Sequence, residues 1–212
     1  SGRRLEALEA HAVEARAAYD AAAAKLSRAR RKHGKALSQA VLLELPPLKL
    51  ERARFEVMIE SSEALAGPQG IDRVEFLVAA NPGTPLAALA KVASGGELSR
   101  FMLALKVVLA AKGSAPTLIF DEIDTGVGGA VADAMGERLQ RLAHDLQVLT
   151  VTHSPQVAGR AANHFLLSKA PEVGAERLVT RVAALAPEHR REEIARMLSG
   201  AHVTEEARAQ AD

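Results

Sequence analysis

The first 45 residues repeat apolar positions at alternating steps of three and four residues. This spacing is typical of a coiled-coil seam. The seam covers about five heptads and runs through Leu5, Leu8, Ala12, Ala15, Tyr19, Ala22, Leu26, Ala29, His33 and Ala36. One amphipathic helix packed on the rest of the chain would fit the pattern. Its length favours the returning helix of a longer antiparallel coiled coil whose other half lies upstream.

Pro46 and Pro47 end this helical region, because proline cannot continue a helix interior. Beyond them, apolar residues alternate with polar ones over residues 54–60 and again over 73–79, with a Gly-Pro-Gln-Gly turn between the two runs. The alternation predicts two half-buried antiparallel strands.

The remainder alternates helical and continuous apolar segments. We predict helices over residues 101–111, 130–144 and 155–162, and strands over 117–123, 147–152, 164–168 and 178–182. Apolar strands joined by a helix predict an α/β fold whose parallel sheet is covered on both faces. We therefore expect an arm helix over residues 1–45, an α/β lobe over 46–200 and a polar tail over 201–212.

Composition excludes several kinds of function. The chain has 212 residues and no cysteine, which rules out disulfides, thiolate catalysis and cysteine-bound metals. Only 3% of residues are aromatic, so a platform for stacking single-stranded bases is not expected. A formal net charge of +1 neither indicates nor excludes DNA binding.

Two features of the chain bear on its setting. No apolar run reaches the roughly 20 residues of a membrane span, so we expect a cytoplasmic protein without a membrane partner. The chain opens with Ser1 and Gly2 rather than Met, which suggests a fragment of a longer protein.

Two adjacent carboxylates, Asp121 and Glu122, directly follow the apolar residues Leu-Ile-Phe of a predicted strand. The first could hold a magnesium-bound water beside nucleotide phosphates, and the second could polarise an attacking water. His153 ends the next predicted strand, and ligands of parallel sheets bind beyond such strand ends. The alternative is a pair of solvated acids and a structural histidine.

The segment Ser94-Gly95-Gly96-Glu97 stands before an apolar helix. Free backbone N–H groups and the helix dipole at such a point favour a phosphate, although Ser94 could equally be a plain N-cap. No Gly-x-x-x-x-Gly-Lys-Ser/Thr loop occurs in the chain. The motifs therefore describe half of an ATP site, whose phosphate cradle must come from elsewhere.

Together these motifs resemble ABC-type ATPase heads and, more narrowly, the RecN family of bacterial DNA-repair proteins, which is related to the SMC proteins. The resemblance rests on residues 93–100, 119–129 and 151–159. It implies the C-terminal lobe of an ABC/SMC-type ATPase head, preceded by a coiled-coil helix. The N-terminal lobe of that family, which carries the phosphate loop, is missing from this sequence.

The resemblance also implies partners. In that family the lobe works with its own N-terminal phosphate-loop lobe, and two heads form a homodimer that sandwiches ATP and Mg²⁺. Hydrolysis separates the heads and moves arms that act on DNA, which implies a nucleoid-associated protein.

Roles for individual residues follow from the same resemblance. Asp121 would hold Mg²⁺ through water, Glu122 and His153 would be catalytic, and Asp124 would couple the two sites across the dimer. Ser94, Gly95, Gly96 and Glu97 would bind ATP held by the opposite head.

Three other functions remain open. The chain could belong to another SMC-like or RecF-like DNA-maintenance ATPase, to a transporter's ATPase subunit, or to a non-hydrolysing coiled-coil tethering module. The heptad arm and the Thr-Gly-Val-Gly-Gly run after Asp124 argue against the transporter. The intact acids and His153 argue against the non-hydrolysing module.

Overall fold

A computed structural model describes residues 2–92, 94–112, 115–171, 178–200 and 203–211. The chain forms two compact units, which are described separately. The arm unit comprises residues 1–46 and 50–98, and the lobe unit comprises residues 47–49 and 99–212. The arm helix thus shares a unit with the strands that follow it.

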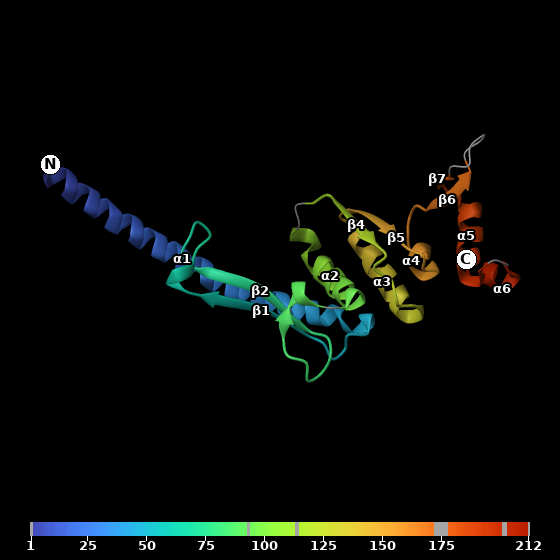
Figure 1. The fold of residues 1–212 in the computed structure, drawn as a ribbon, viewed down its shortest axis with the longest axis horizontal. Helices are drawn as coiled ribbons and strands as arrows, with labels where there is room; N and C mark the ends of the chain where they lie inside the picture. The colour runs from blue at the N-terminus through green and yellow to red at the C-terminus, as the bar shows by residue number, and fades with distance from the viewer. Residues whose placement is uncertain (1, 93, 113–114, 172–177, 201–202, 212) are drawn as a thin grey trace. The chain divides into compact units, whose positions relative to one another are not determined.

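The arm unit is a long helix lying along a β-hairpin (Figure 1). Helix α1 spans Gly2–Glu44, and the antiparallel strands β1 (Arg54–Ser61) and β2 (Asp72–Ala79) confirm the two predicted strands. The short strand β3 (Ala87–Ala88) pairs with β2 on its other side. Single 3-10 turns η1, η2 and η3 lie at Pro46–Leu48, Glu63–Leu65 and Leu89–Lys91.

Helix α1 buries a different row of residues from the predicted seam. Its buried residues are Ala23, Ser27, Gly34 and Val41, whereas Ala22, Leu26, Ala29, His33 and Ala36 of the seam are exposed. Gly34 allows close approach to β1, because a Cβ there would lie 3.1 Å from Cγ1 of Val57. The hairpin therefore covers a face of the helix that differs from most of the seam, but its turn reaches the seam residue Tyr19, whose hydroxyl donates to the carbonyls of Gly67 and Gly70 at 3.1 and 3.2 Å.

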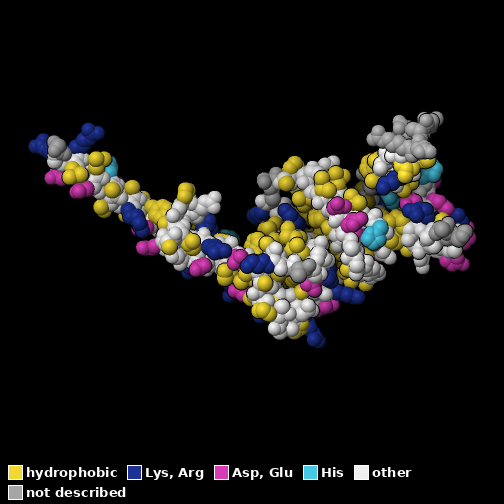
Figure 2. All heavy atoms as spheres, in the orientation of Figure 1, with side chains coloured by type: hydrophobic (Ala, Val, Ile, Leu, Met, Phe, Trp, Pro, Cys, Tyr) yellow, Lys and Arg dark blue, Asp and Glu magenta, His cyan; other side chains and the backbone are white. Residues whose placement is uncertain are grey.

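The first part of α1 extends past the hairpin with its apolar residues exposed. Leu5, Leu8 and Val13 are 59%, 60% and 71% exposed. Figure 2 shows hydrophobic and charged side chains side by side on this stretch. Exposed leucines at heptad spacing are what an unpaired coiled-coil helix would present.

The lobe unit is built on one parallel strand pair. Helix α2 (Gly95–Leu109), which begins in the arm unit, and the turn η4 (Ala110–Lys112) lead into β4 (Thr117–Asp121). Helix α3 (Gly129–Leu142) crosses over to β5 (Gln147–Val151), and the short helix α4 (Pro155–Gly159) follows. β4 and β5 run parallel, with Asp121 opposite Val151.

One face of this strand pair is open, contrary to the expectation that helices would cover both. Phe120 is buried, but Ile119, Leu149 and Val151 on the other face are 70%, 45% and 48% exposed. Period-two alternation puts Asp121 on the exposed face with Ile119. The strands are apolar on both sides, yet the described residues supply helices for one side alone.

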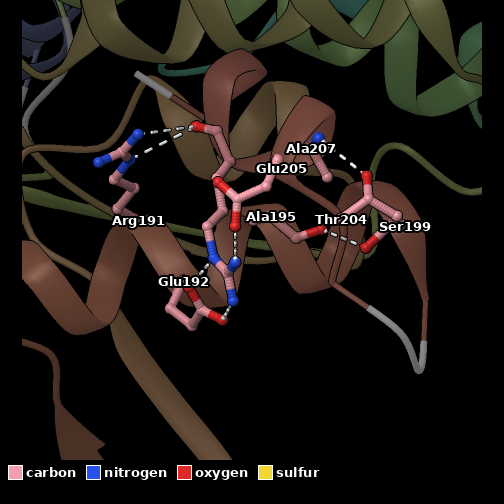
Figure 3. Close-up of polar contacts among 8 residues, drawn as sticks. Arg191, Glu192, Ala195, Ser199, Thr204, Glu205 and Ala207 are labelled. Carbon is pink, nitrogen blue, oxygen red and sulfur yellow. Dashed lines mark hydrogen bonds and ion pairs between the residues drawn. The ribbon is translucent and has the colours of Figure 1, made fainter.

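The C-terminal part forms a separate hairpin and two helices. Strands β6 (Phe165–Pro171) and β7 (Leu178–Ala184) pair antiparallel, apart from β4 and β5. Helix α5 (Pro187–Ser199) was not predicted, and α6 (Glu205–Gln210) lies within the expected polar tail. Figure 3 shows the polar contacts that join these helices, including the hydrogen bonds that Arg191 donates to the backbone carbonyl of Arg208 in α6.

The buried core is mainly aliphatic, although it includes Phe55, Phe101 and Phe120. The largest fully buried side chains are Phe101, Leu45, Leu48, Leu103, Met135, Leu142, Val41 and Asp124. Asp124 is the exception in this apolar set. No helix among the described residues combines the length and the apolar character needed to cross a membrane.

Candidate functional site

An acidic turn follows β4 directly. Asp121 is the last residue of the strand, and both it and Glu122 are exposed. The backbone N–H of Glu122 donates to the carbonyl of Val151 at 3.0 Å, which ties the turn to the end of β5. Thr125 returns two hydrogen bonds to the carbonyl of Glu122, at 3.1 Å from its backbone N and 2.8 Å from its Oγ1. The turn is thus fixed at both ends.

Glu122 has a strained backbone. Its φ is 47°, in the left-handed region that costs residues with a Cβ on the order of 1 kcal/mol or more. The hydrogen bonds to Val151 and Thr125 hold it there. Such strain in a surface acid at a strand end is a common feature of functional sites.

Asp124 lies inside the lobe unit with an exposed fraction of 0%. Its Oδ2 accepts a short hydrogen bond from Oγ1 of Thr152 and a 3.2 Å bond from the backbone N–H of Ser154. The Ser154 N–H also donates to Oγ1 of Thr152 at 2.9 Å. Asp124 therefore contacts the residues on both sides of His153.

His153 follows β5, and its side chain is exposed. Because β4 and β5 are parallel neighbours, their carboxyl ends meet at one edge of the sheet. The structure therefore brings Asp121, Glu122 and His153 together at this edge, as the strand pattern predicted, and Asp124 lies in the same turn.

The donor set fits magnesium held mainly by a nucleotide. Asp121 offers one exposed carboxylate, and no group of three or more metal-binding side chains occurs within the described ranges. Mg²⁺ typically binds one or two protein carboxylates and takes its remaining ligands from phosphates and water. The edge could therefore supply one anchor for a metal–nucleotide complex.

The segment Ser94–Glu97 belongs to the arm unit and begins α2. Ser94 acts as an N-cap, because its Oγ accepts from the backbone N–H of Glu97 at 3.4 Å and its carbonyl accepts from Leu98 at 3.0 Å. Helix α2 therefore starts six residues earlier than predicted. Ser94 and Gly95 are exposed, while Gly96 and Glu97 are half-buried.

Gly95 has no packing reason to be glycine within the described chain. A Cβ at this position would meet no atom within 4 Å. Glycine lowers helix stability relative to alanine, so its use at an open helix start is consistent with close approach by a ligand or another chain.

Thr152 and Ser154 are site residues that the sequence pattern did not identify. Their link to Asp124 joins positions about 30 residues apart, at the ends of two different strands. The signal that could have found them is the run Thr-His-Ser directly after an apolar strand, which supplies two side-chain hydroxyls beside the histidine.

Comparison with known proteins decides the family. No protein-family model matches the chain. It is 40% identical over 211 residues to the DNA repair protein RecN of Vibrio cholerae, covering 100% of this chain and 38% of that protein. The RecN proteins of Rickettsia conorii and Bacillus subtilis are 46% and 38% identical over 197 residues, covering 93% and 86% of this chain.

The chain belongs to the RecN family. It spans 34% to 38% of the length of these three RecN proteins and aligns with their C-terminal part. This confirms the resemblance drawn from the motifs at residues 93–100, 119–129 and 151–159.

Solved structures support the same fold. The Smc head domain with a coiled coil and joint from Pyrococcus yayanosii matches with a TM-score of 0.54 at 18% identity, over 76% of this chain and 28% of that one. A structure from work on ATP-driven dimerization and DNA-stimulated activation of SMC ATPases matches with a TM-score of 0.50 at 17% identity, over 79% and 94%. The fold class is therefore that of an SMC-type ATPase head, with a long helix before it.

Proposed function

We propose that this RecN-family chain is the C-terminal part of an ATP-hydrolysing head that acts in DNA double-strand-break repair. The observation that carries the proposal is the shared sheet edge, where Asp121, Glu122 and His153 lie at the carboxyl ends of two parallel strands. The RecN relatives and the SMC head structures support the same assignment.

The residues at the edge divide the chemistry between them. Asp121 would hold Mg²⁺ through a water molecule, and the metal would neutralise charge on the phosphates. Glu122 would polarise the attacking water as a general base. His153 would donate a hydrogen bond to the γ-phosphate and report its loss.

The open sheet face supports an N-terminal lobe that covers it. Ile119, Leu149 and Val151 are exposed on the face that also carries Asp121. A lobe with a phosphate loop packed on this face would bury the three apolar residues and bring phosphates beside Asp121. We call the protein that contains both lobes the two-lobed protein.

The Ser94–Glu97 segment is proposed to act on ATP held by a second head. Ser94 and Gly95 are exposed at the start of α2, where the helix dipole favours an anion. ATP would then bridge two copies of the head in a homodimer. Hydrolysis would release them and move the arms on DNA, in the bacterial cytoplasm at the nucleoid.

Asp124 is still proposed to couple the two heads, but indirectly. Its carboxylate is fully buried, so direct contact with a second head would fall to the loop that follows. Thr125, Gly126 and Gly128 in this loop are all exposed, as is Gly129 at the start of α3.

Glu122→Gln in the two-lobed protein tests the function. The amide keeps the shape of the side chain but cannot accept a proton, so turnover should fall about 10²- to 10⁴-fold while ATP binding persists and ATP-bound dimers accumulate. Glu137→Gln, at an exposed acid on α3, is the matched control and should leave turnover unchanged. Normal turnover in the Glu122 variant would remove Glu122 from its role.

A second measurement tests dependence on the missing lobe. This chain alone should bind and hydrolyse ATP far more weakly than the two-lobed protein, since it carries no phosphate loop. Comparable hydrolysis by both would contradict the proposal and point to a phosphate cradle within the chain.

A further inference from the structure

We infer that Asp124 is a positioning residue that locks His153 to the acidic turn within one head. This inference rests on the proposed roles of Glu122 and His153 in ATP hydrolysis. It gives Asp124 a task inside its own head, through Thr152 and Ser154, whereas contact between heads would fall to the loop that follows it.

The contacts of Asp124 fall on both sides of His153. Oδ2 accepts from the Thr152 hydroxyl and from the Ser154 backbone N–H, and the second donor–acceptor distance is 3.2 Å. Ser154 and Thr152 are also bonded to each other, at 2.9 Å from N to Oγ1. The backbone that carries the imidazole is therefore held on either side by one carboxylate oxygen.

The other end of the link leads to Glu122. Asp124 lies two residues after Glu122, in a turn closed by hydrogen bonds from Thr125 to the Glu122 carbonyl. The Glu122 N–H binds the carbonyl of Val151, the residue before Thr152. Two separate connections thus join the turn to the His153 segment and close a ring of backbone and side chains.

Such a ring restricts relative movement of the two side chains. A shift of the His153 segment must break the Asp124 contacts or carry the turn with it. Glu122 and His153 are both exposed at the sheet edge, so the ring lies beneath them. This geometry fits a device that holds a general base and a phosphate sensor in one arrangement.

The burial of Asp124 argues that its carboxylate serves this link. A buried carboxylate is costly unless it is hydrogen-bonded, and Oδ2 has two donors. Oδ1 has no hydrogen-bond partner among the residues that the structure describes. A carboxylate with an exposed fraction of 0% does not present itself to a second head.

Thr152 offers the sharper test, because valine has nearly its shape without the hydroxyl. In the two-lobed protein, Thr152→Val should lower kcat about 10- to 100-fold and leave the ATP dissociation constant within about threefold, because misplacement of reacting groups affects the chemical step. Thr152→Ser keeps the donor and should retain near-normal kcat. Each variant is assayed well below its own melting temperature, so that a loss of folded protein does not lower the rate.

Two results of these assays would contradict the link between Asp124 and the His153 segment. The first is a normal kcat in Thr152→Val, or a loss confined to ATP binding. The second is a loss of kcat in Thr152→Ser as large as that in Thr152→Val, because the serine hydroxyl should keep the hydrogen bond to Asp124.

A readout independent of turnover separates this inference from the proposed function. In the two-lobed protein with labelled histidine, the His153 imidazole signal, assigned with His153→Gln, should shift or broaden in Thr152→Val and stay unchanged in Thr152→Ser. Amide exchange at Ser154 should quicken in the valine variant alone. Unchanged His153 and Ser154 signals in Thr152→Val would refute the link whatever Glu122→Gln does. Changed signals together with normal turnover in Glu122→Gln would uphold the link and refute the proposed function.

Discussion

Ser27, midway along α1, donates a 2.6 Å hydrogen bond to Oδ1 of Asp72 at the start of β2. Ser61 donates to the same oxygen at 2.6 Å, and Arg30 donates to Oδ2 at 3.0 Å. The Asp72 side chain is fully buried. Burial raises the pKa of this carboxyl, but the three donors and the charge of Arg30 outweigh it and lower the pKa to about 2. A polar network therefore fastens the arm helix to the hairpin.

Removing this carboxylate should loosen the arm. Asp72→Ala would leave the hydroxyls of Ser27 and Ser61 and the guanidinium of Arg30 without this acceptor and should lower the free energy of unfolding by about 3 kcal/mol. Asp20→Ala is the matched control, because Asp20 pairs with Arg16 at an exposed site on the same helix and should cost less than about 0.5 kcal/mol. Urea unfolding followed by circular dichroism measures both. Equal losses would mean that the network contributes nothing beyond a surface pair.

Acid should weaken the same attachment within a defined pH window. The pKa of Asp72 is about 2 when folded, against an ordinary value of 3.8, so the unfolded chain takes up a proton first as pH falls. The contribution is fully present above about pH 4 and is lost between about pH 4 and 2, for a total of about 2 kcal/mol. Urea midpoints measured from pH 5 to 2 should show a shallower decline in Asp72→Asn than in the native sequence. Identical slopes would place the acid sensitivity at other carboxyls.

Local sequence patterns predicted most of the helices and strands, but not which residues of the long helix are buried. Strands β1 and β2 followed from strict alternation, and β4 and β5 from apolar runs around a helix. Helix α5 was missed because its surface is mostly charged and only Ile194 and Ala195 are buried. The row that α1 buries was also missed, because it depends on Gly34 and Ser27 meeting a hairpin further along the chain.

Part of the candidate site could likewise be predicted from the sequence, and part could not. The positions of Asp121, Glu122 and His153 followed from two apolar strands that each end in a polar residue, since parallel strands bring those ends together. The inward orientation of Asp124 could not be predicted, because it depends on Thr152 and Ser154 in the neighbouring strand end. The order of apolar and polar residues along one strand does not show which residues of a neighbouring strand will form hydrogen bonds to it.

Close contact between α3 and α4 makes Gly136 sensitive to a single methyl group. A Cβ there would lie 2.9 Å from Cγ of Arg160, 3.1 Å from the Gln156 carbonyl oxygen and 3.3 Å from Cα of Val157. Because two of these atoms are backbone, Gly136→Ala should lower the free energy of unfolding by about 1–3 kcal/mol. Gly95→Ala, where a Cβ meets no atom within 4 Å, should change it by less than about 0.5 kcal/mol. Thermal unfolding compares the two, and equal melting temperatures would show that α4 moves aside at no cost.

Helix α6 should depend on Arg208 for its attachment. The guanidinium donates to both oxygens of Glu192 on α5 at 2.9 Å and also binds Glu205 within α6. Arg208→Ala should therefore expose the α6 amides and raise their hydrogen-exchange rates about tenfold, with α3 unaffected. Glu205→Ala keeps the pair between the helices and should have a smaller effect. Equal protection of α6 in the Arg208 variant would mean that burial of Ala207 and the bonds from Arg191 to the backbone carbonyl of residue 208 hold the helix without the ion pair.

Ser94 offers a test of the composite ATP site. Its side chain is exposed before α2 and is proposed to meet ATP bound by another head, so Ser94→Arg in the two-lobed protein should leave nucleotide affinity of a single head intact but block ATP-dependent dimerisation. The bulk of the arginine, rather than its charge alone, would exclude the second head. Ser168→Arg, at an exposed serine on β6, is the matched control and should dimerise normally.

Sedimentation of the Ser94→Arg variant with and without ATP distinguishes the outcomes. A normal ATP-dependent dimer in Ser94→Arg would exclude this segment from the interface between heads, whereas a loss of ATP binding by the single head would place Ser94 at its own nucleotide.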